Sequence, residues 1–154
     1  MKVNSWIFLF AIALASCNNN IVFEDYKSFE NQSWNADSIV SFNYSARDTT
    51  SQNQLIIKIR HTTDYEFQNL FLFVKTEKTD TIEILLANKE GMWLGDGIGD
   101  IREFKYVYKN NKVFNKKKNL TIEIEQAMRY GGLEKIQELN NISAVGLSIQ
   151  KQDE

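Results

Sequence analysis

The feature that most constrains this chain is an alternation of apolar and polar residues that recurs from about residue 38 onward. Successive side chains of a β-strand point to opposite faces of a sheet, so this alternation predicts strands with one buried face. Six segments rich in β-branched and aromatic residues show it: 40–45, 55–60, 82–86, 104–108, 120–125 and 145–149. Val22 and Phe23 add a further candidate strand at a sheet edge.

One more segment, residues 70–74, is apolar without interruption. It predicts a strand that is covered on both faces or lies at the centre of a sandwich. Turn-forming residues separate the candidates, at positions 48–53, 88–91, 110–111 and 115–119. We therefore expect an all-β fold, a β-sandwich of the jelly-roll or immunoglobulin-like kind with about seven to eight strands.

Helical spacing occurs in one short stretch of the mature chain. Leu133, Ile136 and Leu139 recur at intervals of three after a pair of glycines. This spacing predicts at most one short helix, of about two turns.

The first seventeen residues have the pattern of an export signal. Lys2 gives a positive start, and residues 6–15 are all apolar. This apolar run is too short to span a bilayer, which takes about 20 helical residues, and it has the length of a signal-peptide core. It ends in Leu14-Ala-Ser-Cys17, which resembles the bacterial lipobox, where the peptide is cut before a Cys that carries the lipid. The alternative is an ordinary signal peptide with a chance Cys.

These observations divide the chain into three parts. Residues 1–16 are the expected lipoprotein signal peptide, which is removed, and residues 17–20 are the lipidated Cys17 with a short tether. Residues 21–154 form a single domain of a size that buries one proper core. Cys17 is the only cysteine, so no internal disulfide stabilises the domain. The chain is expected in the bacterial cell envelope, attached to a membrane through its lipid.

The composition excludes several classes of function. Acidic and basic residues nearly balance at a formal net charge of −2, which gives no basic footprint for nucleic acid. The chain has one His, and it shows no catalytic triad, zinc spacing or dinucleotide fingerprint. Glu24 and Asp25 are adjacent on a predicted strand and therefore point apart, and His61 is expected at the surface of a strand end. We expect no enzyme activity, no metal and no cofactor apart from the lipid.

The segment 91–100 holds four of the seven glycines together with Trp93, Asp96 and Asp100. A calcium loop is one interpretation, but the EF-hand spacing is absent, and a phosphate-binding loop lacks its usual Lys and helix. The favoured interpretation is an irregular loop or bulged strand whose glycines adopt positive φ and whose Trp93 packs on the sandwich. The alternative is a contact with a protein or a glycan.

Two further features suggest surface contacts. Trp34 and Trp93 remain after processing, and exposed aromatic faces can stack on sugars, so a glycan-binding function stays open. Lys116, Lys117 and Lys118 form a basic turn, which either touches anionic lipid headgroups or only blunts a sheet edge.

Several segments taken together resemble the gliding motility lipoprotein GldH family of the Bacteroidota. The most specific are 93–100, Trp-Leu-Gly-Asp-Gly-Ile-Gly-Asp, and 126–129, Gln-Ala-Met-Arg. The others are Cys17, 22–28, 34–35, 39–42, 59–60, 64–65, 69–72, 80–81 and 142–146. The resemblance implies a periplasm-facing accessory lipoprotein of the gliding machinery, tied to type IX secretion, with envelope proteins as partners and no catalytic residues.

The leading hypothesis is therefore a membrane-anchored accessory protein that acts by protein–protein contacts, and the rival is a glycan-binding envelope lipoprotein. Asn18-Asn-Asn20 carries no acidic residue after Cys17, which favours the periplasmic face of the inner or outer membrane over surface export. The candidate contact residues are Trp34, Trp93, Asp96, Asp100 and Arg129.

Overall fold

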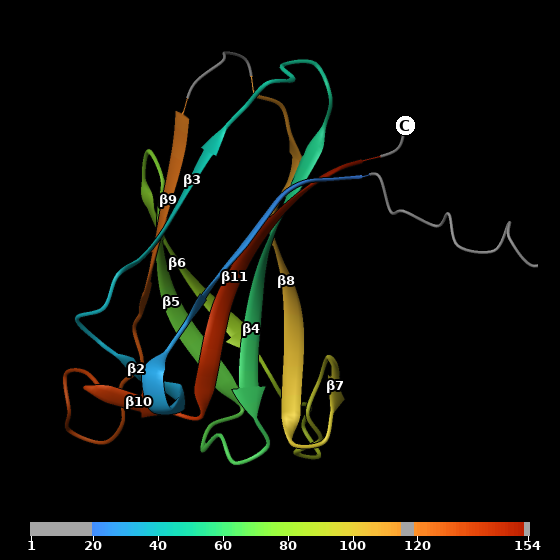
Figure 1. The fold of residues 1–154 in the computed structure, drawn as a ribbon. Coiled ribbons are helices and arrows are strands. Elements are labelled where there is room, and N and C mark those ends of the chain that lie inside the picture. The colour runs from blue at the N-terminus through green and yellow to red at the C-terminus, as the bar shows by residue number, and fades with distance from the viewer. Residues whose placement is uncertain (1–19, 115–118, 153–154) are drawn as a thin grey trace, which may run out of the picture.

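Two antiparallel sheets packed face to face form the domain in a computed structural model, which describes residues 20–114 and 119–152 (Figure 1). The first sheet has the order β1 (Ile21–Ser28), β11 (Ile142–Lys151), β4 (Asn53–Thr62), β8 (Ile101–Lys112) and β7 (Asp96–Ile98). The second sheet has the order β3 (Val40–Ser45), β9 (Asn119–Gln126), β5 (Asn69–Lys75) and β6 (Thr79–Leu85). The predicted all-β sandwich is confirmed.

A small two-stranded ladder lies at one end of the sandwich. It pairs β2 (Ser33–Asn35) with β10 (Glu138–Asn140), and the short 3₁₀ turn η1 (Glu30–Gln32) precedes it. All eight candidate strands are present, and β1 lies at a sheet edge as expected. The three-residue strands β2, β7 and β10 were not predicted, because three residues are too few to show an alternation.

The one helical candidate of the sequence is not a helix. Residues 133–137 are not helical, and β10 begins at Glu138. A side chain from another segment fixes the backbone there, because the side-chain amide of Gln126 donates to the carbonyl of Ile136 at 2.6 Å. The segment 70–74 forms an inner strand of the sandwich, the second of the two predicted arrangements: Leu70, Leu72 and Val74 are buried, and Phe71 and Phe73 are half-buried on the opposite face.

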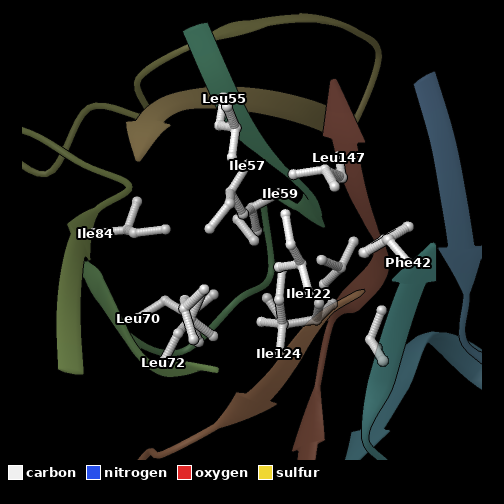
Figure 2. Packing of buried hydrophobic residues seen from close by; sticks show 14 of the residues in the cluster. Phe42, Leu55, Ile57, Ile59, Leu70, Leu72, Ile84, Ile122, Ile124 and Leu147 are labelled. Carbon is white, nitrogen blue, oxygen red and sulfur yellow. The ribbon is translucent and has the colours of Figure 1, made fainter. Parts of the chain in front are cut away.

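The core lies between the two sheets, and Figure 2 shows side chains from both sheets meeting there. Each core strand contributes alternate residues, as the sequence pattern predicts. The fully buried set includes Ile57 and Ile59 of β4, Leu70 and Leu72 of β5, Ile122 and Ile124 of β9, and Leu147 of β11. Burying one such side chain contributes roughly 1.5–3 kcal/mol. This core therefore provides the main stabilisation of a domain in which the described residues contain no cysteine.

The outer face of the first sheet carries an ordered polar cluster. The ring of Tyr26 lies across Gly146, where a Cβ atom would come within 2.6 Å of the ring. Its hydroxyl donates to Glu103 at 3.1 Å, and Arg60 donates to the same carboxylate at 2.8 Å. Lys58 lies beneath these side chains and forms an ion pair with Glu24. This pairing explains why a lysine on the outer face of the sheet is almost fully buried.

The two ends of the sandwich differ, and we name them by their distance from the chain start. The tether end holds Asn20, whose carbonyl accepts from the amide of Lys151 at 2.7 Å, together with loops 46–52 and 76–78. The distal end holds loops 63–68, 86–95 and 127–137 and the β2–β10 ladder. Figure 1 shows the beginning of β1 and the end of β11 together at one end, far from β2, β7 and β10.

Candidate functional site

A cluster of rings holds the distal loops together. The ring of Trp93 lies 4.7 Å from that of His61 and 6.4 Å from that of Tyr65, measured between centroids. Phe67 continues the cluster, 5.7 Å from Tyr65 and 5.8 Å from Tyr130. These five residues, the distal aromatic cluster, connect the end of β4 to all three distal loops, so these loops are braced against one another.

Trp93 packs on the sandwich, as the favoured interpretation of its loop predicts. It is half-buried against the core, and its segment pairs antiparallel with the residues that follow β6, through a bridge to Ala87 and a bond from the amide of Leu94 to the carbonyl of Leu86. The expected positive φ occurs at Gly91, Gly95 and Gly99. The loop is therefore an irregular turn that folds back on the segment after β6.

Gly95 is needed for two reasons at the start of β7. Its φ is +84°, in the left-handed region, and a Cβ atom there would lie 2.2 Å from the carbonyl oxygen of Glu103. Such a distance is far inside van der Waals contact, so the close approach of β7 to β8 requires a glycine here, as it does at Gly97, where a Cβ atom would lie 1.9 Å from the carbonyl oxygen of Ile101.

His61 is not at the surface, and that expectation is wrong. Its side chain is 0% exposed, and its Nδ1 donates to the carbonyl of Thr62 at 2.8 Å. Its Nε2 has no hydrogen-bond partner among the described residues. Burial lowers the pKa of His61 below its usual value, with a smaller contribution from the positive charge of Arg102, while the Thr62 carbonyl opposes both. A neutral imidazole therefore forms part of the distal aromatic cluster.

Trp34 does not provide a contact surface, so this part of the candidate set is wrong. It is 0% exposed, its ring stacks on Phe29 at 4.9 Å, and its indole N–H donates to the carbonyl of Ser38 at 3.0 Å. Both ring faces and the polar atom are thus used within the fold. Long-range packing decides this burial, and the local sequence does not reveal it.

The other candidates are exposed at the distal end, but they do not converge. Asp96 lies in β7 opposite Glu103, Asp100 lies in the turn before β8, and Arg129 lies in the loop after β9. The described ranges contain no group of three or more His, Cys, Asp or Glu side chains placed to hold a metal ion. Cys17 and Lys116–Lys118 lie outside the described residues.

The 126–129 segment fixes the last distal loop to the second sheet. The side-chain oxygen of Gln126 accepts from the amide of Met128 at 3.0 Å, and the carbonyl of Met128 accepts from Ile136 at 2.9 Å. The sulfur of Met128 accepts from the amide of Phe71 at 3.3 Å. This motif therefore shapes a loop and presents Arg129 and Tyr130 outward.

Large apolar side chains are exposed on these braced loops. Ile98, at the tip of the β7–β8 hairpin, is 92% exposed, and Tyr130 is 69% exposed. Other exposed apolar residues at this end are Ile39, Leu85, Met92, Ile101 and Leu133. Sequence reasoning missed these residues; the one available signal was Ile98 itself, an isoleucine between two glycines in a segment already singled out.

The distal loops also carry an excess of acidic side chains. The acidic residues in the connections 29–39, 63–68, 86–100 and 127–137 are Glu30, Asp37, Asp64, Glu66, Glu90, Asp96, Asp100 and Glu134. The basic residues in these connections are Lys89, Arg129 and Lys135. The distal end therefore combines exposed apolar groups with a negative surround, as a protein-contact surface with a polar rim does.

The sequence matches a known protein family and two named relatives. The family described as GldH lipoprotein matches residues 21–149. The chain belongs to the GldH lipoprotein family. It is 38% identical to a protein of Christiangramia forsetii named "Gliding motility lipoprotein GldH homolog", over 96% of this chain and 95% of that protein. It is 36% identical to "Gliding motility lipoprotein GldH" of Flavobacterium johnsoniae, over 99% of both chains.

Membership of the GldH family confirms the resemblance drawn from the sequence. It supports a lipoprotein of gliding motility located at the cell envelope. The matched range begins at the first residue of β1 and ends within β11, so it coincides with the sandwich. None of the helices in the described part of the chain has the length and apolar character needed to cross a bilayer.

Proposed function

We propose that this chain is a membrane-anchored, periplasm-facing accessory protein of the gliding machinery, linked to type IX secretion, and that it acts through protein contacts at its distal end. The observation that carries the proposal is the set of exposed apolar side chains on the braced distal loops. An enzymatic function is not proposed, because the names of the relatives refer to motility and the exposed acidic candidates do not converge.

The position of the predicted anchor supports this assignment. Asn20 is three residues after Cys17 in the chain, and a fully extended chain covers at most about 3.6 Å per residue, or about 11 Å here. A lipid on Cys17 therefore keeps the tether end near the membrane, and the distal end, on the opposite side of the sandwich, faces away from it (Figure 1).

Rigidity supports the same surface. Ile98 lies on a hairpin whose geometry Gly95 fixes, and Tyr130 is held by its contact with Phe67. Apolar anchors on an ordered surface lose little conformational entropy on binding, and such anchors at the centre of an interface supply most of its affinity. The distal end is therefore suited to a partner protein.

The glycan alternative has less support. Trp34 offers no free face, and Trp93 is half-buried with His61 and Tyr65 close to its ring. Tyr130 contacts Phe67 and is the one aromatic side chain among the large apolar residues exposed in the described part of the chain, so it has no second exposed ring beside it to form a platform for a sugar.

The decisive experiment replaces the distal apolar groups in the native host. The double variant Met92→Ser/Ile98→Ser should abolish gliding on agar at normal protein abundance, because it removes two exposed anchors. The matched control is Ile21→Ser/Val107→Ser, which removes two exposed apolar groups outside the distal end. Gliding by the distal variant at the rate of the control would refute the assignment of this surface.

The anchor has a separate test. Cys17→Ala should abolish fatty-acid labelling and release the protein from washed membranes, since Cys17 is the only thiol available for lipidation. Labelling that persists in this variant would show that the lipid is attached elsewhere or that the signal has been misassigned.

A further inference from the structure

We propose that the tether end carries a second site, a depression that binds the anionic headgroup of a membrane phospholipid and seats this end of the sandwich on the bilayer. The proposal rests on the anchor at Cys17, but it is independent of any contact made by the distal end.

The depression lies where the edges of the two sheets meet. It has a volume of about 560 Å³ and is lined by Val22, Tyr44, Ser45, Arg47, Asp48 and Lys151. Aromatic rings pack between the two sheet edges beside the depression: the ring centroid of Tyr44 lies 5.5 Å from that of Phe23 of β1 and 5.4 Å from that of Phe114. The floor is therefore ordered, and the open side carries the charged groups.

Asp48, the one acidic residue that lines the depression, has hydrogen-bond partners within the fold at both carboxylate oxygens. One carboxylate oxygen of Asp48 accepts from Lys151 at 2.5 Å and from the hydroxyl of Ser51 at 2.7 Å. The other accepts from the amides of Thr50 and Ser51 at 2.9 and 3.2 Å. These donors, Lys151 first, hold the pKa of Asp48 far below its usual range. Asp48 is thus a structural group that remains ionised and neutralises Lys151.

Arg47 is left with an uncompensated charge at the mouth of the depression. Its side chain is exposed, and no carboxylate among the described residues forms an ion pair with it. A guanidinium presents a planar set of donors that matches two oxygens of a phosphate group. The depression therefore has a net positive charge and a donor suited to phosphate.

The charge of the surrounding surface favours the same ligand. Lys78 and Lys112 are exposed at this end together with one acid, Glu77, whereas the distal loops have an acidic excess. A domain with basic groups at one end and acidic groups at the other orients its basic end toward an anionic surface. Tyr44 and Val22 add an aromatic and an aliphatic group of the kind that sits well at the boundary of a membrane.

The length of the tether identifies the membrane as the occupant. Cys17 lies at most about 11 Å from Asn20 when the chain is fully extended, and Asn20 is bonded to Lys151, a residue that lines the depression. The headgroup layer is itself about 5–7 Å thick on each side of a bilayer. A lipid attached to Cys17 therefore holds the depression within reach of the headgroups.

The test uses the single thiol of the chain. The chain from Cys17 onward is coupled through Cys17 to a maleimide lipid in vesicles of phosphatidylcholine, either pure or with about 30% phosphatidylglycerol, and amide hydrogen exchange is followed. Residues 46–52 should be protected on the anionic vesicles and not on the neutral ones. Arg47→Glu should lower this protection by about an order of magnitude, since each basic group near an anionic surface contributes roughly a fivefold factor and this change removes one and adds an opposing charge.

The matched control is Lys89→Glu, which makes the same change in charge at the distal end and should retain the protection. Arg47→Gln, a milder change at an exposed position, serves if Arg47→Glu alters the melting temperature. Equal protection on neutral and anionic vesicles, or full protection in both Arg47 variants, would overturn the proposal. Protection of the soluble chain by inorganic phosphate alone would also overturn it, because the depression would then be a site for small anions. Chemical coupling makes these results independent of the lipobox and of any partner protein.

Discussion

The two ends of the sandwich hold their loops by different means. At the tether end, loop 46–52 is organised by hydrogen bonds to one carboxylate, that of Asp48. At the distal end, three loops are joined by packed rings around Trp93. One core therefore supports two kinds of surface: a polar end with an organised charge, and a ring-braced end that exposes apolar groups.

The two ends should also contribute differently to the stability of the domain. Ring packing removes large apolar areas from water, so mutations inside the distal braces should cost much stability. Hydrogen bonds at an exposed loop contribute less, because water competes for the same groups. The predictions below test this contrast.

The largest effect is expected for Trp34→Ala, which empties a fully buried site at the distal end. The free energy of unfolding should fall by about 3–5 kcal/mol, the usual cost of truncating a buried large aromatic residue. Trp93→Ala, at a half-buried ring, should cost less, and Asp48→Ala, which removes the carboxylate that organises loop 46–52 at the tether end, serves as the comparison. Urea denaturation measures all three; a cost for Asp48→Ala equal to that of Trp34→Ala would contradict the difference between the ends.

A somewhat smaller effect is expected for Gly95→Ala. Gly95 and Gly99 both have positive φ, but only at Gly95 does a Cβ meet backbone atoms, while Gly99 faces open space. Gly99→Ala should therefore cost about 1–2 kcal/mol from backbone strain alone. Gly95→Ala should cost a further 1–3 kcal/mol or so from overpacking against β8. Equal melting temperatures of the two variants would show that β7 can move away from β8 freely.

A pH-dependent effect is expected from His61, the only histidine of the chain. Its pKa is lowered in the folded state mainly by burial, so the unfolded chain binds more protons in the acid range. Stability should therefore be unaffected above the ordinary pKa of about 6.5 and should fall as the pH drops below it, until the folded-state pKa is passed.

Measurement of the unfolding free energy from pH 7.5 to pH 5 in the wild type and in His61→Gln tests this link. The variant keeps a hydrogen-bond donor but cannot titrate in this range. The difference between the two curves should shrink as the pH falls below about 6.5. Parallel curves would assign the acid sensitivity to carboxylates elsewhere.

The smallest effect on stability is expected for Ile98→Ser. Its side chain is almost entirely exposed, so its removal should change the unfolding free energy by no more than about 0.5 kcal/mol. Ile21→Ser at the tether end should behave in the same way. A loss above 1 kcal/mol or so for Ile98→Ser alone would mean that the hairpin tip stabilises the fold and is not merely presented to a partner.

The sequence predicts the long strands of this fold because their signal is local. In β4, the alternation of Ile57 and Ile59 with Lys58 is visible in a window of a few residues. The helical candidate was wrong because the spacing of Leu133, Ile136 and Leu139 also fits a loop. The hydrogen bond from the side chain of Gln126 to the carbonyl of Ile136 holds this loop, and the two residues are 10 positions apart in the chain.

The candidate site was predicted less well, since burial at the distal end depends on contacts between distant segments. Trp34 is covered by Phe29 and by the β2–β10 ladder, whose partners lie about a hundred residues apart. His61 is enclosed by Tyr65 and Trp93, so its surroundings appear only when β4 and the loop after β6 are brought together. Trp93 was placed correctly because its neighbouring glycines indicated an irregular segment with positive φ, in which a large ring can fold back onto the sandwich.

The position of β1 at the edge of the first sheet has a mechanical consequence. β1 begins at the tether end and runs antiparallel to β11, and its backbone hydrogen bonds lie across the direction of the strand. If a partner holds the distal end while the lipid holds Cys17, tension acts along β1. Such a load shears the bonds between β1 and β11 together, and does not peel them apart one at a time. The Tyr26 ring across Gly146 and the Glu24–Lys58 ion pair resist the same displacement, so β1 is well attached to its sheet against a load applied between the two ends of the domain.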